Sequence, residues 1–242
     1  MSHRWIPDAR RVDLVVIEPD RESFAIVVLG DFNPSIFQPL WFSLNGLVPD
    51  EEAKTADISV IHKQFASFSI GKILVQVDDS RLGLTTIESS QGPILRDLAI
   101  GTLSILEHTP LKAIGLNRDM VIALDTEEAW HAVGDRLVPK SDWMQIFDRP
   151  GMRHVVVEGK RPNCSADQLH IRIQPSANRE VLIAVNQHYQ LETDQRKEVR
   201  DRHKEAIRVL QSDWTSFVAY SRDAAYKLLH LAPSNECSEQ ET

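Results

Sequence analysis

The sequence is poor in cysteine, and it has neither a long apolar run nor an excess of basic residues. Its two cysteines, Cys164 and Cys237, form no CxxC pair, which excludes a disulfide framework and a cysteine-based metal site. No apolar run approaches the length of about 20 residues that a membrane span requires. Residues 1–7 lack the apolar core of a secretory signal. These absences predict a cytoplasmic protein with reduced thiols and no membrane contact.

Acidic residues outnumber basic residues in this chain. Its 242 residues include 27 Lys and Arg against 35 Asp and Glu, which gives a net charge of −8 at pH 7. Proteins that coat nucleic acid normally carry excess positive charge, because phosphate contacts dominate their affinity. Nucleic-acid binding is therefore disfavoured, except through a local basic loop.

Common catalytic and nucleotide-binding patterns are also missing. The chain has no G-x-S-x-G nucleophile turn, no G-x-x-x-x-G-K-[ST] loop and no G-x-G-x-x-G fingerprint. Glu127 and His131 can share one face of a helix, but no paired motif supplies the further ligands that a metal site needs. We therefore expect neither a cofactor nor a resident metal ion.

Alternating apolar and polar residues predict antiparallel strands along most of the chain. Together with the helices expected between them, they predict an α+β fold of antiparallel β-meanders packed with helices. The expected strands lie at 12–18, 23–30, within a meander at 57–88, at 111–124 with an interruption near 115–117, and at 153–158, 168–174 and 181–190.

Helices are expected at four places. Asn33 and Pro34 open a first one that kinks or breaks at Pro39. A second spans 93–108, and a third runs from a capping box formed by Asp125 and Glu128 to about residue 137. From 194 to 230 there is neither Gly nor Pro, and apolar residues recur at steps of three and four, which predicts one long helix.

The order of elements suggests two halves. Three strands and a helix at 65–107 recur as three strands and a helix at 153–229, which is the pattern of two β-β-β-α halves without visible sequence similarity. No linker rich in Gly, Ser or Pro divides them. The predicted divisions are an N-terminal half at 1–137, a connecting loop at 138–152, a C-terminal sheet and helix at 153–231, and a disordered tail at 232–242.

The strongest candidate for catalysis is Glu158-Gly159-Lys160, at the end of an expected strand. A carboxylate and a lysine at this spacing resemble half of the site of a metal-dependent nuclease of the restriction type. In that chemistry an upstream acid joins the glutamate in holding a divalent cation. Asp148 is the only nearby acid at a plausible distance along the chain.

Three groups of residues suit contacts with a partner. One is the apolar seam of the long helix, and another is the aromatic segment 32–44, because aromatic side chains dominate protein interfaces. The third is a basic cluster that suits a phosphate or an acidic partner. Their members are Ile207, Leu210, Trp214 and Phe217 in the helix, Phe37 and Trp41 in the aromatic segment, and Arg149, Arg153, Lys160 and Arg161 in the basic cluster.

Because no catalytic set converges, the leading hypothesis is a non-catalytic protein-binding or assembly subunit of a soluble bacterial-type complex. Its partner is another protein or a second copy of the chain, bound through the long helix or the aromatic segment. One alternative is a metal-dependent, nuclease-like hydrolase around Glu158 and Lys160. Another is a small-molecule sensor with a ligand between the sheet and the long helix.

Overall fold

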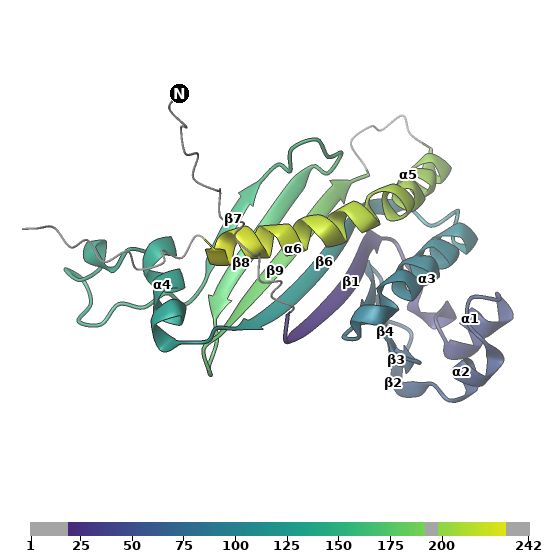
Figure 1. The fold of residues 1–242 in the computed structure, drawn as a ribbon. Helices are drawn as coiled ribbons and strands as arrows, with labels where there is room; N and C mark the ends of the chain where they lie inside the picture. The colour runs from purple at the N-terminus through teal and green to yellow at the C-terminus, as the bar shows by residue number, and fades with distance from the viewer. Residues whose placement is uncertain (1–18, 192–197, 231–242) are drawn as a thin grey trace, which may run out of the picture.

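The computed structural model describes residues 19–191 and 198–230. In these residues nine antiparallel strands form one sheet, in the order β2-β3-β4-β5-β1-β6-β9-β8-β7 (Figure 1). The strands are β1 (Arg21–Gly30), β2 (Asp57–Ile61), β3 (Phe65–Ile70), β4 (Ile73–Asp78), β5 (Arg81–Thr86), β6 (Leu111–Ala123), β7 (Val155–Gly159), β8 (Gln168–Pro175) and β9 (Glu180–Gln190).

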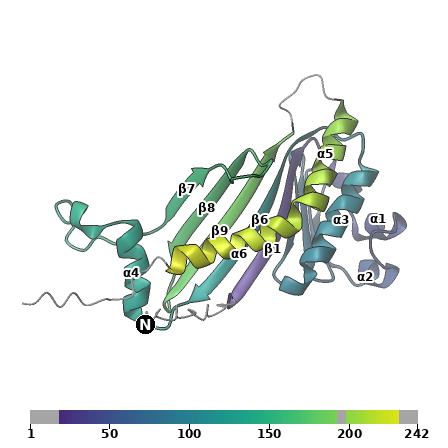
Figure 2. The same cartoon turned by 45° about the horizontal axis from the view of Figure 1, so that its top comes forward.

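The longest helices cover one face of this sheet. Figures 1 and 2 show α6 crossing over the central strands, with α5 and α3 beside each other at its N-terminal end. The helices are α1 (Pro39–Leu44), α2 (Asp50–Lys54), α3 (Gly92–Ile105), α4 (Glu127–Leu137), α5 (Val199–Ser212) and α6 (Trp214–His230), with short 3-10 turns at Pro34–Ile36, Ser89–Gln91 and Lys140–Asp142.

The core lies between the sheet and these helices. Every second residue of β9 is buried, beginning with Val181, Ile183 and Val185. This alternation arises because successive side chains of a strand point to opposite faces. The opposite face of the same strand carries half-buried residues such as Ala184 and Asn186. One face of the sheet therefore supplies the core.

A buried arginine ties α6 to the centre of the sheet. Arg118 of β6 pairs with Glu22 of β1 at 2.5 Å, and its guanidinium lies 5.0 Å from the ring centre of Phe24. It also donates to the backbone carbonyl of Val218 at 2.7 Å and to the Ser221 hydroxyl at 3.1 Å, both in α6. The charge is thus compensated where it is buried, as a buried ion requires.

The structure confirms the α+β class and the meander at 57–88. The helix expected after Asn33 is broken into two short pieces, the turn Pro34–Ile36 and α1. Two local predictions were wrong. The strand β6 runs without interruption, and α4 is capped by Thr126 rather than Asp125, because the Thr126 hydroxyl accepts a hydrogen bond from the Ala129 amide at 3.1 Å.

The single long C-terminal helix was also a wrong prediction. The structure has two helices, α5 and α6, which meet at Asp213. The Asp213 carboxylate accepts hydrogen bonds from the Tyr189 hydroxyl at 2.8 Å and the Ser165 hydroxyl at 3.1 Å. The helix breaks where this residue is bound to β9 and to the loop before β8. The continuous apolar spacing does not mark that junction.

The two predicted halves share one sheet. Strand β6 from the first half pairs with the whole of β9 from the second, so the loop 138–152 does not divide the sheet. Each meander returns to the strand that precedes it, since β5 pairs with β1 and β9 pairs with β6. The expected strand at 12–18 and the tail at 232–242 lie outside the described residues.

Candidate functional site

The strand β7 forms one edge of the sheet, and two of its apolar side chains are exposed. It pairs with β8 and, among the described residues, with no other strand. Val156 is 48% exposed and Val157 is 58% exposed. Neighbouring strand residues point to opposite faces, so both faces of this edge present apolar surface. A free edge of this kind offers unpaired backbone N–H and C=O groups to another chain.

The opposite edge of the sheet is built differently. Strand β2 has a bulge between Ile58 and Val60 where it pairs with β3. Bulges twist an edge and interrupt its ladder of hydrogen bonds, which protects it from further pairing. The register of β7 on β8 is regular from Val155 to Gly159. Of the two edges, β7 is therefore the better template for an added strand.

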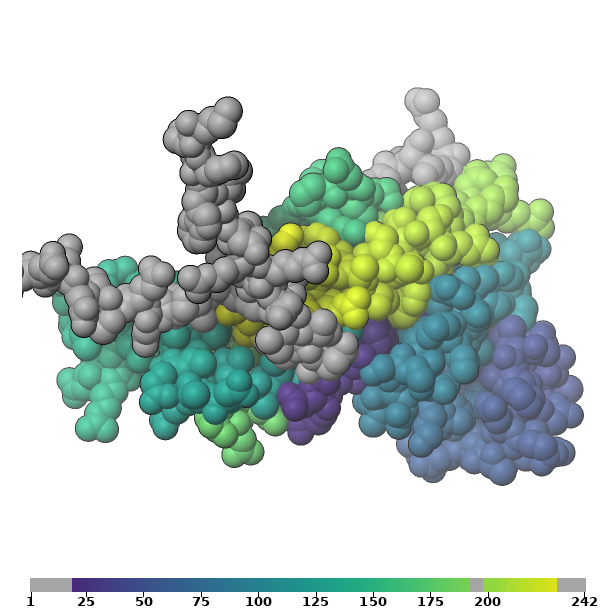
Figure 3. All heavy atoms as spheres, in the orientation of Figure 1, coloured from purple at the N-terminus to yellow at the C-terminus, as the bar shows by residue number. Residues whose placement is uncertain are grey.

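An apolar loop lies close in the chain to β7. We call residues 143–147 the apolar loop; it follows α4 and projects beyond the end of the sheet (Figures 1 and 3). Its rings of Trp143 and Phe147 lie 6.4 Å apart. Exposed apolar clusters commonly mark sites of interaction. The exposed fractions are 43% for Trp143, 65% for Met144, 68% for Ile146 and 55% for Phe147.

A cavity of about 520 Å³ lies between α4, the apolar loop and the start of β7. This volume is in the usual range for ligand-binding cavities. Arg149 and Arg153 lie on its wall, and neither has an ion-pair or hydrogen-bond partner within the described part of the chain. The cavity therefore combines apolar walls with two uncompensated cations. Its apolar wall includes Trp130, Val138, Trp143, Phe147, Pro150, Met152 and Pro175.

The predicted basic cluster is thus divided between the two ends of β7. Arg149 and Arg153 lie before the strand, at the cavity, and exposed Lys160 follows its last residue. Arg161 has an internal role. It donates to Gln187 Oε1 at 3.0 Å and to the Ser216 hydroxyl at 2.5 Å, and its guanidinium lies 4.3 Å from the ring centre of Tyr220.

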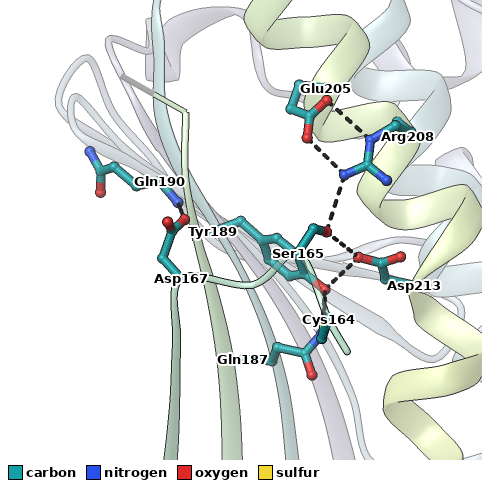
Figure 4. A network of polar contacts seen from close by, with 9 residues as sticks. All are labelled: Cys164, Ser165, Asp167, Gln187, Tyr189, Gln190, Glu205, Arg208 and Asp213. Atoms are coloured by element: carbon teal, nitrogen blue, oxygen red, sulfur yellow. Dashed lines mark hydrogen bonds and ion pairs between the residues drawn. The ribbon is translucent and has the colours of Figure 1, made fainter. Parts of the chain in front are cut away.

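A polar network holds the chain that follows β7 (Figure 4). The Tyr189 hydroxyl donates to Asp213 Oδ2 and accepts from the Gln187 amide. Ser165 donates to the same Asp213 oxygen, and Arg208 donates to the Ser165 hydroxyl at 3.3 Å. These bonds link the loop before β8, the strand β9 and the junction of α5 with α6. They hold the loop between β7 and β8 on the body of the molecule.

The electrostatics of this network favour a neutral tyrosine. Burial and the neighbouring Asp213 carboxylate together raise the pKa of the Tyr189 hydroxyl far above its ordinary value. Cys164 lies at the margin, 3.9 Å from the Tyr189 hydroxyl oxygen and 3.4 Å from the Gln187 amide nitrogen. A tyrosine that remains protonated and donates to a carboxylate acts as a structural donor, so we assign the network to the fold.

The structure does not bring the predicted catalytic residues into one site. Glu158 accepts a hydrogen bond from Gln168 at 3.1 Å and lies 4.0 Å from the His170 ring nitrogen. Asp148 and Lys160 are exposed, and no hydrogen bond or ion pair among the described residues joins them to Glu158. No group of three or more His, Cys, Asp or Glu side chains in the described ranges is arranged to hold a metal ion.

Most of the predicted interface residues belong to the core. Phe37, Leu210 and Phe217 are fully buried within the chain, and Trp214 is 4% exposed. Ile207 and Trp41 are half-buried and pack against the same core. The spacing of Ile207, Leu210, Trp214 and Phe217 reflects the face of α5 and α6 that packs on the core. The apolar loop was missed, although a run of apolar residues between Pro139 and Pro150 without a strand or helix period was its signal.

Comparison with known proteins does not assign the chain to a family. No protein-family model matches the chain, and no curated protein sequence matches it significantly. In the described part of the chain, no helix is long and apolar enough to cross a membrane. The candidate functional features are therefore the edge strand β7, the apolar loop and the cavity.

Proposed function

We propose that this protein is a non-catalytic, protein-binding subunit of a cytoplasmic complex. It binds an extended segment of a partner protein along the free edge of β7, and the apolar loop packs against that partner. The observation that carries the proposal is the exposure of Val156 and Val157 on a regular edge strand, together with four exposed large apolar side chains in the apolar loop that precedes it in the chain.

Strand addition is a recurrent way in which proteins bind extended peptides. Main-chain hydrogen bonds along the edge supply affinity, and alternate side chains supply specificity. Association here would remove exposed valines and the rings of Trp143 and Phe147 from water, and each Å² of apolar surface so buried contributes about 25 cal/mol. The loop that follows β7 is held by Arg161 and the Tyr189 network, which limits the freedom that this end of the template loses on binding.

The first prediction tests the edge directly. Random twelve-residue peptides displayed on phage are selected against the full chain, and the affinities of the synthetic peptides are measured by fluorescence polarisation. Val157→Lys places a charge on the edge, and charged edge residues oppose strand pairing. We expect it to weaken binding about tenfold, which corresponds to about 1.4 kcal/mol.

Ile58→Lys is the matched control. Ile58 is 53% exposed, close to the 58% of Val157, and it lies on the opposite edge strand β2. It should leave the affinities unchanged, and both variants should keep the wild-type circular dichroism spectrum. The proposal fails if no peptide is selected, or if the selected peptides bind the Val157→Lys variant as tightly as the wild type.

A further inference from the structure

We propose that the segment bound at β7 is acidic on both sides of an apolar centre. This inference rests on the proposed function, because it names the chemistry of the partner segment at the same edge. Its basis is the charge at the two ends of the strand. Arg149 and Arg153 precede β7, and Lys160 follows it.

These three cations are uncompensated. All three are exposed, and none has an ion-pair or hydrogen-bond partner in the described ranges 19–191 and 198–230. By contrast, Lys140 at the cavity pairs with Asp135 at 2.8 Å, and Lys204 on α5 pairs with Asp201 at 3.3 Å. These cations lie at both ends of an edge strand and have no carboxylate partner among the described residues. They therefore attract carboxylates of a binding partner. The strand itself contributes a single acid, Glu158.

The same charges disfavour a second copy of the chain as the occupant. Two copies related by a two-fold axis pair their edge strands antiparallel. A two-fold axis through Val157, at the centre of the strand, sets Arg153 of one copy opposite Arg161 and adjacent to Lys160 of the other. Like charges directly opposite each other destabilise a strand pair. In this central register the flanking cations disfavour a second copy and favour a different chain, one with acidic flanks.

The cavity adds a second element to the partner segment. Its wall includes Arg153 and His154, which come immediately before β7, and Pro175 at the end of β8. A strand that pairs with β7 therefore ends over the cavity. The apolar wall suits a large aliphatic or aromatic side chain, and Arg149 and Arg153 suit a carboxylate beside it. The expected segment has an apolar centre, acidic flanks and a large apolar residue at this end.

The second prediction is tested on peptides whose binding is weakened by Val157→Lys. We expect these peptides to carry Asp or Glu on both sides of an apolar core. Arg153→Glu and Lys160→Glu should each weaken their binding about tenfold. The affinity of the wild-type protein for the same peptides should fall as salt rises from about 50 to about 500 mM, because salt screens the attraction. Lys63→Glu is the matched control, because exposed Lys63 follows β2 as Lys160 follows β7, and it should change affinity less than about twofold.

The cavity is tested by Gly134→Leu. Gly134 lies on α4 at the cavity wall, and a Cβ placed there meets only Met152 Cβ at 3.9 Å. The larger side chain fills the cavity without weakening a helix that gains a better helix former. The substitution should lower the affinity for peptides with a large apolar end about tenfold, and it should not lower the thermal stability of the protein.

The outcomes separate the two proposals. Peptides that depend on Val157 but carry neutral or basic flanks, or that bind the charge-reversed variants unchanged, overturn the acidic segment and leave strand addition intact. Unchanged binding to the Gly134→Leu variant overturns the role of the cavity. The absence of any peptide that depends on Val157 overturns the proposed function itself.

Discussion

Tyr189 shows at the scale of a residue how a polar side chain stabilises the body that carries β7. It is 3% exposed, its hydroxyl donates to Asp213 at 2.8 Å, and the Gln187 amide donates to it. Burial raises the pKa of this hydroxyl, so the folded state favours the protonated form more strongly than the unfolded state does. The contribution to stability is complete below the unfolded pKa of about 10, and it is lost as the pH rises above that value.

The third prediction follows for Tyr189→Phe. Removing the hydroxyl leaves Asp213 and Gln187 each without one partner, and we expect the free energy of unfolding to fall by about 1–2 kcal/mol at pH 7. The difference between wild type and variant should shrink as the pH rises above about 10, because the wild-type hydroxyl is then neutral only in the folded state. Urea unfolding of both proteins at pH 7 and pH 11 measures this. An equal difference at the two pH values would contradict the role assigned to the buried hydroxyl.

At the scale of the element, Arg149 and Arg161 of the predicted basic cluster have different roles on the two sides of β7. Arg161 joins the end of β7 to β9 and α6 through Gln187, Ser216 and Tyr220. Arg149 lies at the cavity without a partner in the described part of the chain. Among the described residues only the first has hydrogen-bond and cation–π partners, so the two side chains should differ sharply in their effect on stability.

The fourth prediction compares their alanine variants. Arg161→Ala removes three hydrogen bonds and a cation–π contact, and it should cost about 1–3 kcal/mol of unfolding free energy. The free energy of unfolding of Arg149→Ala should stay within about 0.5 kcal/mol of the wild-type value, as is usual for surface substitutions. Its affinity for the acidic peptides should fall. Guanidinium unfolding and peptide titration of both variants provide the comparison. Equal losses of stability in the two variants would contradict the assignment of Arg161 to the fold and of Arg149 to peptide binding.

The elements differ in how far the sequence predicts them. Strand β9 was expected at 181–190 and is Glu180–Gln190, because its alternation is local and one face packs on the core. The junction at Asp213 was not predictable, since Leu210, Trp214 and Phe217 keep helical spacing across it and the break depends on contacts from Tyr189 and Ser165. The apolar loop has no period, so only the fold shows that its side chains are exposed.

At the scale of the whole molecule, the distribution of charge decides where an acidic segment can bind. The chain carries a net charge of −8, which repels acidic chains over most of the surface. Among the described residues, Arg149, Arg153 and Lys160 have no ion-pair or hydrogen-bond partner, and they lie at the two ends of the regular edge strand β7. Attraction and strand pairing thus coincide at β7. The same distribution opposes pairing of two copies at that edge.

The most direct test of this account is amide hydrogen exchange of the full chain with and without a selected peptide, followed by mass spectrometry. Backbone groups that pair with an added strand become protected from exchange. The account predicts slower exchange in Val155–Gly159 and in residues 143–147 when the peptide is bound, with α5 and α6 unchanged. Protection confined to α5 and α6 or to residues 32–44, with β7 exchanging as in the free protein, would contradict it.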